Sequence, residues 1–250
     1  WTENKELMDF VKKKEKETWQ VRETATTAGE KLVSIIKAEG VKKLDRVFLT
    51  HADQDHVGSL RELAEGLPID AVYFPKGAEG NAAFAAVLLE LQSQHQVGLF
   101  PLLGKVDLEI DADFVFHILA PLAPGEGGNE DSLVIQTSIG GLDWLFTGDL
   151  GEEGEEVLMR TYPDLKTDVL KIGHHGSATS SSEGFLDHVQ PELALISAGK
   201  QNRYGHPDAQ ILERLELRNI PIFRTDRQGA IHFLYGSEET EWRTILENKK

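Results

Sequence analysis

Short apolar runs alternate with amphipathic stretches along most of the chain. Strands are predicted where a few apolar residues lie between turn signals, and helices where apolar positions recur every three to four residues. Strands are predicted at 46–50, 71–75, 96–100, 106–110, 114–119, 132–138, 143–147, 167–172, 193–197 and 220–225, with a closing antiparallel pair at 229–236 and 241–246. Helices are predicted at 26–38, 57–66, 81–94, 151–160, 181–189 and 207–218.

This order of elements predicts a layered α/β fold. No internal repeat and no linker divides the chain, so residues 1–250 are expected to form a single domain. Residues 1–25 form an N-terminal segment without a clear element, in which the charged stretch 4–22 is a helix or a loop. Residues 120–131, rich in Gly and Pro, form a long loop of the kind that often carries function.

The composition narrows the chemistry. Hydrophobic residues make up 40% of the chain and cysteine is absent, so a metal ion would be bound by His and carboxylate, as suits zinc, manganese or iron. The net charge of -16 disfavours simple binding of a polyanion, although bound metal ions would supply local positive charge. No apolar run is long enough to span a bilayer, so this chain itself is expected to be soluble and not to insert into a membrane.

The strongest motif is "THADQDHVGSL", which directly follows the predicted strand 46–50. It places His51, Asp53, Asp55 and His56 at a strand end, where α/β folds form their sites. Four nitrogen and oxygen donors within six positions suit a pair of divalent cations. The alternative is that Asp53 or Asp55 only caps the following helix, a role that requires neither histidine.

Two further strands end in residues of the same chemistry. "WLFTGDL" places Asp149 after one strand, and "VLKIGHHGSATSSS" places His174 and His175 after another. A carboxylate at such a position can bridge two metal ions, whereas the alternative for Asp149 is a cap for the helix at 151–160. The spacing does not decide which of the two histidines binds metal.

A fourth strand end, "SAGKQNRYGHPDAQ", combines basic residues with a histidine. A helix is expected to begin near Pro207, and the free amides of its first turn favour an anion. We therefore expect Lys200, Arg203 and His206 to bind a phosphate rather than a metal ion. The alternative is a solvated loop.

The motifs "THADQDHVGSL", "NEDSLVI", "FTGDL" and "KIGHHGS" together resemble the metallo-β-lactamase superfamily. The stretches "LKIGHHGS", "LISAGKQNRYGHP" and "RTDRQGAIHF" resemble one branch of it, the C-terminal domain of the ComEC competence proteins, which are bacterial DNA-uptake channels. The resemblance extends from about Gly29 to Phe233. It implies a four-layer αββα sandwich with two mixed sheets and a dinuclear site of zinc or manganese.

Hydrolysis at such a site assigns roles to individual residues, and the resemblance implies which of them bind the metals. In the proposed hydrolysis the metal pair activates a water molecule, and Asp53 or Asp55 takes its proton. Asp149 would position both metals and His206 would stabilise charge on the phosphate. The implied ligands are His51 and Asp53 for the first metal, Asp55 and His56 for the second, Asp149 between them, and His174 or His175.

Two departures from the family pattern affect these expectations. The histidine that commonly completes the first metal site is absent, and the nearest residues are Asn129, Asp131 and Ser132. Asn129 and Ser132 are kept as candidate substrate contacts, and the oxygen-rich donor set favours manganese over zinc. The opening "DVGQGD"-like segment is also missing, so we expect a sandwich that lacks its first strands.

For the ComEC branch the implied activity is a nuclease that degrades the DNA strand that is not imported during natural transformation. The implied location is the extracytoplasmic face of the bacterial cell membrane, beside a membrane channel of the same or a neighbouring polypeptide. One alternative is a hydrolase of small esters, lactones or phosphocholine-type substrates, since a fold does not fix the substrate. The other is a non-catalytic DNA-binding or assembly module of the channel.

Overall fold

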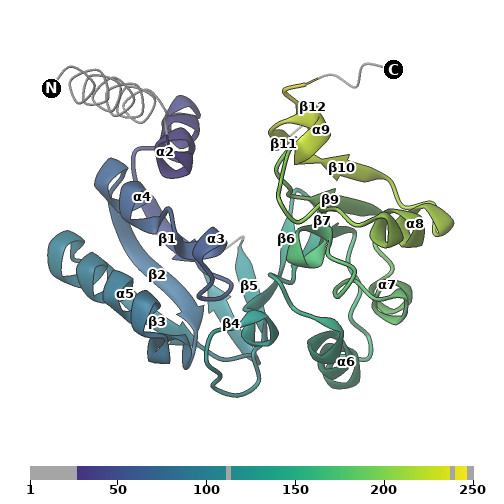
Figure 1. Ribbon diagram of the computed structural model, residues 1–250, viewed down its shortest axis with the longest axis horizontal. Coiled ribbons are helices and arrows are strands. Elements are labelled where there is room, and N and C mark those ends of the chain that lie inside the picture. Colours follow the sequence, from purple (N-terminus) through teal and green to yellow (C-terminus); the bar gives the residue numbers. More distant parts are fainter. Residues whose placement is uncertain (1–26, 111–113, 237–239, 247–250) are drawn as a thin grey trace, which may run out of the picture.

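The computed structural model describes residues 27–110, 114–236 and 240–246. Two β-sheets pack face to face in it, and helices cover the outer surface of each sheet (Figure 1). This order of helix, sheet, sheet and helix confirms the layered α/β fold expected from the sequence. The expectations for residues 1–25 lie outside the described residues.

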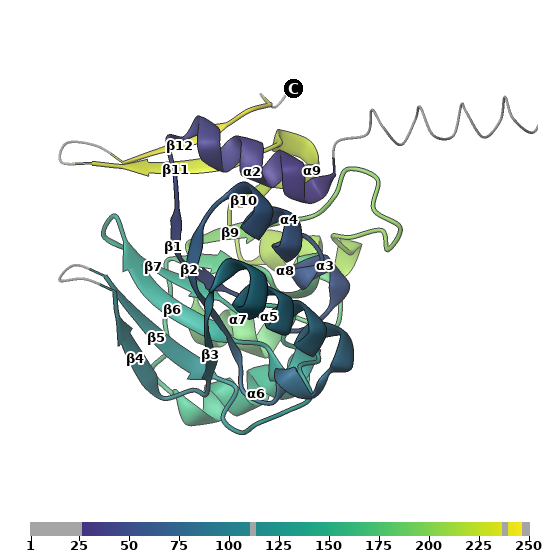
Figure 2. The same ribbon diagram turned by 90° about the vertical axis from the view of Figure 1, so that its left-hand side faces the viewer.

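The first sheet has three parallel strands in the order β1-β2-β3 (Figures 1 and 2). Helix α2 opens with a capping box between Thr27 and Glu30, and the side chain of Asn81 caps helix α5. The elements are α2 (Ala28–Ala38), β1 (Leu44–Phe48), α3 (Gln54–Val57), α4 (Leu60–Gly66), β2 (Ile69–Pro75), η1 (Ala78–Gly80), α5 (Ala82–His95) and β3 (Gly98–Leu102).

The second sheet has seven strands in the order β10-β9-β8-β7-β6-β5-β4. Strands β4 to β7 pair antiparallel, and β7 to β10 pair parallel. The elements are β4 (Val106–Glu109), β5 (Val115–Ala120), η2 (Asn129–Asp131), β6 (Val134–Ile139), β7 (Leu142–Phe146), α6 (Glu152–Thr161), β8 (Val169–Lys171), η3 (Gly173–Gly176), α7 (Glu183–Val189), β9 (Leu193–Ile196), α8 (Ala209–Leu217), β10 (Ile222–Arg224) and α9 (Thr225–Gln228).

Three clusters of buried apolar side chains hold the layers together. One joins the first sheet to its helices and includes Val72 and Phe84. The second joins the seven-stranded sheet to its helices and includes Leu170 and Phe185. The third, which includes Ile118, lies between the two sheets. Each fully buried side chain of this size contributes roughly 1.5–3 kcal/mol to folding, so the third cluster helps to hold the two sheets together.

The chain closes with the hairpin of β11 (Ile231–Tyr235) and β12 (Thr240–Thr244), which confirms the predicted antiparallel pair. Its aromatic side chains pack against the second sheet. The Trp242 ring lies 4.7 Å from the Phe233 ring and 5.4 Å from the Trp144 ring of β7, measured between centroids. The hairpin therefore covers the inner face of β7.

Several predicted boundaries differ from the structure by two residues or more, and three of them concern segments that carry predicted site residues. The helix expected at 57–66 is two helices, because α3 already begins at Gln54. The strand expected at 46–50 ends at Phe48, since the Thr50 carbonyl turns to accept from the Leu133 amide at 2.7 Å. The helix expected from Pro207 begins at Ala209, where the Asp208 carboxylate accepts from the Gln210 amide and caps it. Among the described residues, every helix is too short or too polar to cross a lipid bilayer.

Candidate metal centre

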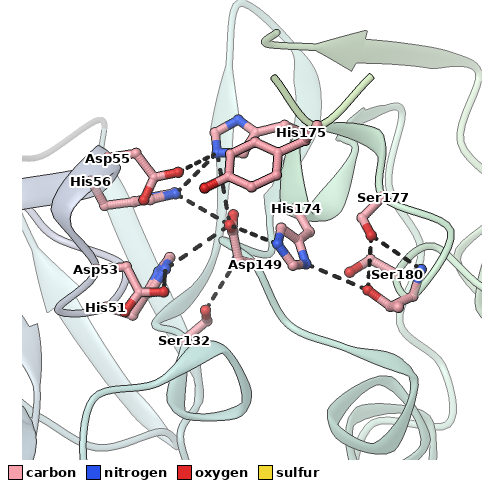
Figure 3. Close-up of polar contacts among 12 residues, drawn as sticks. His51, Asp53, Asp55, His56, Ser132, Asp149, His174, His175, Ser177 and Ser180 are labelled. Atoms are coloured by element: carbon pink, nitrogen blue, oxygen red, sulfur yellow. Dashed lines mark hydrogen bonds and ion pairs between the residues drawn. The ribbon is translucent and has the colours of Figure 1, made fainter. Parts of the chain in front are cut away.

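The predicted site residues meet at the carboxyl ends of four strands. The segment after β1 carries the 51–56 motif, the segment after β7 carries Asp149, and the segment after β8 carries His174 and His175 (Figure 3). The loop after β9 brings His206 to the same edge, with its ring centroid 5.9 Å from that of His174. Sequence reasoning therefore predicted correctly which segments lie together.

The 51–56 motif is held in an extended form before helix α3 begins. The Ala52 amide donates to the Gly127 carbonyl at 2.8 Å. His51 is fully buried, and its Nε2 atom has no hydrogen-bond partner among the described residues. Asp53 occupies the N-cap position of α3 but makes no capping hydrogen bond, and Asp55 lies inside the helix. Helix capping, the alternative reading of these aspartates, is therefore wrong.

Thr50 orients two of the histidines. Its hydroxyl oxygen lies 3.0 Å from Nδ1 of His51 and 2.9 Å from Nδ1 of His56. Protonated Nδ1 atoms on both rings would both donate to this oxygen and leave both Nε2 atoms as acceptors. Histidine ligands of metal ions are typically fixed in this way by a hydrogen bond to the other ring nitrogen.

Asp149 lies at the centre of the cluster (Figure 3). Its Oδ2 atom is 3.3 Å from Nε2 of His56, 3.7 Å from that of His175, 3.8 Å from that of His174 and 4.0 Å from that of His51. The carboxylate is almost fully buried. Four imidazoles around one buried carboxylate form a donor set suited to cations. Helix capping by Asp149 is excluded, because Gly151 is the N-cap residue of α6.

Close packing around Gly148 sets the position of Asp149. The Asp149 amide donates to the hydroxyl of buried Ser132 at 3.1 Å. Gly148 has a φ of 59°, and a Cβ atom there would lie 2.8 Å from both Ser132 Oγ and Thr50 Cβ. Glycine is therefore required at this turn.

The two adjacent histidines have different surroundings. Nδ1 of His175 donates to the Ser197 carbonyl at 2.9 Å. Its Nε2 lies 3.2 Å from that of His56 and 3.4 Å from Asp55 Oδ2. His174 instead approaches the Thr179 hydroxyl at 3.5 Å. Both residues have positive φ, 46° and 55°, a conformation that non-glycine residues rarely adopt outside constrained sites.

Two triads in this cluster have ligand atoms close enough together to hold a metal ion. They share His56 and involve residues from three of the four strand ends. His51 Nε2 also lies 3.7 Å from Asp53 Oδ2, so Asp53 adds an oxygen beside the buried histidine. The triads are His51, His56 and Asp149, and Asp55, His56 and His175.

The electrostatics of the centre favour the metal-binding forms of its residues. Burial, together with neighbouring His56, lowers the pKa of His51 to about 4. Burial raises the pKa of Asp149, but the hydrogen bond with His56 and the surrounding histidines outweigh it and bring that pKa down to about 2. Neutral imidazole and ionised carboxylate are the forms that coordinate a cation.

The remaining predicted residues make hydrogen bonds with backbone amides or lie in the surrounding loops. Asp131 accepts the amides of 126–128 with one carboxylate oxygen and holds the long loop in place. Ser132 contacts the Asp149 amide, and Asn129 opens the short helix η2. Lys200 is exposed, and Arg203 stacks 4.6 Å from the centroid of the Tyr204 ring.

Sequence reasoning missed Thr50 and Ser197. The position of Thr50, directly before His51 at a strand end, was a usable signal, because a hydroxyl there can reach the following imidazoles. Ser197 acts through its carbonyl, which no side-chain pattern reveals. The sequence also predicts that free amides in the first turn of a helix at Pro207 bind an anion. The Gln210 amide is not free for this, because it donates to the Asp208 carboxylate.

Comparison with known proteins identifies a family and relatives of this chain. The family model described as the metallo-beta-lactamase superfamily matches residues 23–200. ComE operon protein 3 of Bacillus subtilis (strain 168) is 39% identical over 222 residues, which cover 88% of this chain and 28% of that protein. Competence protein ComA of Neisseria gonorrhoeae is 34% identical over 220 residues, which cover 85% of this chain and 28% of that protein. The chain thus spans under a third of the length of either relative.

A solved structure shares the fold at low sequence identity. CmlA, a diiron beta-hydroxylase from Streptomyces venezuelae, aligns with a TM-score of 0.56 and 14% identity. The alignment covers 84% of this chain and 46% of that chain. At this identity the likeness concerns the fold alone.

Proposed function

The chain belongs to the metallo-beta-lactamase superfamily, and from that premise we propose that its centre is a metal-dependent phosphodiesterase that cleaves DNA. Its relatives of the ComEC family give the fold a competence-related context. The observation that carries the proposal is the cluster around Asp149, in which the buried His51 Nε2 has no partner while three other imidazole nitrogens face the same carboxylate.

The donor set fits two divalent cations, either manganese or zinc. His51, Asp53 and Asp149 would hold one, and Asp55, His56, His175 and Asp149 the other. Bound metal ions would supply Lewis-acid activation of a water molecule and of the phosphate. Thr50 and Ser197 keep the histidine Nε2 atoms available for them, through the hydrogen bonds to Nδ1.

The chain's own residues account for the remaining needs of hydrolysis. Asp53 and Asp55 have exposed side chains at the mouth of the centre, where either carboxylate can accept the proton of the attacking water. His206 lies beside His174 and can donate to a phosphate oxygen that gains negative charge. Asn129, Lys200 and Arg203 remain candidates for contacts along the DNA backbone.

The proposed substrate is DNA, specifically the strand that is not taken up during natural transformation. The chain covers only 28% of the length of its relatives, so a channel portion in the same or a neighbouring polypeptide would place it at the extracytoplasmic face of the cell membrane. The chain has a net charge of -16, which repels a long anionic substrate. The affinity for DNA would therefore depend on the metal ions and on the few basic residues near the centre.

The test is cleavage of labelled single- and double-stranded DNA with manganese, zinc, magnesium or a chelator. We expect metal-dependent cleavage by the wild type and none by Asp55→Ala or His56→Ala, with unchanged far-UV circular dichroism. His117→Ala is the matched control, because His117 pairs with Asp107 in the β4–β5 ladder outside the centre.

Three other results would contradict the proposal. Turnover of chromogenic esters with intact DNA would favour a small-ester, lactone or phosphocholine-type hydrolase. DNA binding that survives chelation, without cleavage, would favour a non-catalytic DNA-binding or assembly module. Unfolding of both variants would assign Asp55 and His56 a structural role.

A further inference from the structure

Lys171 is the last residue of β8 and lies close to the centre without a role in the ligand set. Its register partners are Phe146 of β7 and Leu195 of β9. Phe146 packs in the cluster between the two sheets, so Lys171 lies on the inner face of the seven-stranded sheet. The turn that carries His174 and His175 begins two residues later.

The ammonium of Lys171 is directed to this end of the sheet. Nζ donates to the Ile172 carbonyl at 2.8 Å, directly before the histidine turn. No carboxylate of the described residues lies within ion-pair distance of it, so this half-buried ammonium retains two donors without an acceptor among the described residues. Burial lowers the pKa of Lys171 to about 8, while the carboxylate of Asp149 opposes this shift. The side chain therefore still carries its positive charge at neutral pH, within electrostatic range of the centre.

A half-buried ammonium without a counterion favours a charge-assisted hydrogen bond to an anion. Two other half-buried basic side chains of the second layer are already engaged: Arg214 donates to the carbonyls of 178, 180 and 181, and Arg224 pairs with Asp226 at 2.7 Å. The partner that fits Lys171 is an anion that enters from the site.

We propose that Lys171 is an anion-binding residue of this centre and that its ammonium contacts a non-bridging oxygen of the scissile phosphodiester. The substrate class rests on the proposed function. The charge balance of the centre supports the assignment. Two divalent cations, held by the three carboxylates of Asp53, Asp55 and Asp149, would leave one net positive charge. A phosphodiester neutralises that charge, and further negative charge that gathers on the phosphoryl oxygens during displacement needs an additional cation.

The main competing role is structural, with Lys171 serving only as a donor to the Ile172 carbonyl. Lys166→Met provides a matched control, because Lys166 Nζ also donates to a single backbone carbonyl, that of His188, at 2.6 Å and away from the centre. Lys171→Met keeps the length of the side chain and removes its charge. Lys171→Arg keeps the charge in another shape.

The first measurement is the rise in the unfolding temperature of the metal-loaded protein on addition of inorganic phosphate. We expect the rise in wild type and in Lys166→Met, and its loss in Lys171→Met. Without phosphate, Lys171→Met should unfold at the same or a higher temperature than wild type, because an unpaired, half-buried charge has been removed. An undiminished response to phosphate in Lys171→Met would overturn the proposal.

The second measurement is DNA cleavage together with bound metal. Lys171→Met should lower kcat by roughly 100- to 1,000-fold at unchanged metal content, and Lys171→Arg should recover part of it. A joint fall of unfolding temperature, metal content and kcat would assign Lys171 to the structural role and overturn the proposal. A third outcome separates the two proposals. If wild type cleaves no DNA, and phosphate stabilises wild type but not Lys171→Met, the proposed function fails while the anion site stands.

Discussion

The Nδ1 atom of His175 donates to the Ser197 carbonyl at 2.9 Å, across the ends of β8 and β9. A carbonyl oxygen only accepts, so the proton of this imidazole is fixed on Nδ1 and Nε2 is left as a free acceptor. That Nε2 faces Asp55, His56 and Asp149. The adjacent His174 lacks such a carbonyl partner among the described residues, so the two histidines differ in what they can bind.

The first prediction separates these two histidines. His175→Ala should lower bound metal to about one ion per chain or less, because it removes a nitrogen from the triad with Asp55 and His56. His174→Ala should retain the metal content of wild type, since its Nε2 approaches only Asp149, at 3.8 Å. Metal analysis of both purified variants checks this. Equal metal loss in the two variants would contradict the assignment.

The second prediction concerns Thr50. Thr50→Val keeps the shape of the side chain but removes the oxygen that lies 3.0 Å and 2.9 Å from the Nδ1 atoms of His51 and His56. We expect metal affinity to fall by roughly 10- to 100-fold, the usual cost of losing such a partner, measured by competition with a metal indicator. Thr137→Val is the control, a buried threonine whose hydroxyl donates to the Val115 carbonyl in the sheet. Wild-type affinity in Thr50→Val would show that its hydroxyl orients neither imidazole.

The sequence was sufficient to predict which segments form the site, because apolar strands that end in His or Asp bring those residues to one sheet edge. It did not distinguish His174 from His175, since that choice depends on a carbonyl 22 residues away and on two positive φ angles. The sequence predicts a start of α8 that is two residues too early. Pro207 suits a first helical turn, but the side chain of Asp208 caps the helix, which begins at Ala209. Asp131 lies where the family pattern commonly has a metal-binding histidine, but its carboxylate accepts from three backbone amides.

The third prediction is that manganese activates cleavage more strongly than zinc. Asp53, Asp55 and Asp149 offer oxygen donors, the chain has no cysteine, and Asp131 is engaged with the loop backbone rather than facing the centre. Oxygen-rich sites favour hard cations such as manganese. Turnover of a labelled oligonucleotide after loading with stoichiometric manganese or zinc checks this, with bound metal measured in each sample. Equal or faster turnover with zinc would contradict it.

The fourth prediction is that His206 acts on substrate and not on metal. The Asn202 side chain accepts from the His206 amide at 2.9 Å and also donates to the His206 carbonyl, which holds this residue in the loop after β9. His206→Ala should lower turnover by roughly 100- to 1,000-fold, the typical loss for one charge-stabilising donor. Bound metal should stay unchanged. His232→Ala, on β11, is the control. Metal loss in His206→Ala would make it a ligand, and full activity would make the loop a solvated one.

The last prediction concerns Glu155, a buried carboxylate on α6 that supports the loop after the histidine turn. It accepts the amides of Ser181 and Ser182, the latter at 2.9 Å. The hydroxyl of Ser181 in turn accepts from the amide of Gly173, at the start of the histidine turn, at 3.2 Å. Burial raises the pKa of Glu155 from 4.5 to about 7, although its hydrogen bonds to Ser181 and Ser182 oppose this.

Between pH 4.5 and about 7 the folded protein keeps a proton on Glu155 that the unfolded chain releases. The free energy of unfolding therefore falls as pH rises through this window, and the full cost, at most about 3 kcal/mol, is present above it. Glu155→Gln carries no charge, so it should lack this component, even though one of the two amides loses its acceptor at every pH. The other titrating groups are shared with wild type and cancel in the difference. Urea unfolding of both proteins from pH 4 to 8 measures the difference between their free energies of unfolding. As pH rises, this difference should shift in favour of the variant. Glu156→Gln, the exposed neighbour on α6, should show a gap that does not change with pH, and an equally constant gap for Glu155→Gln would show that Glu155 is not protonated in the folded protein.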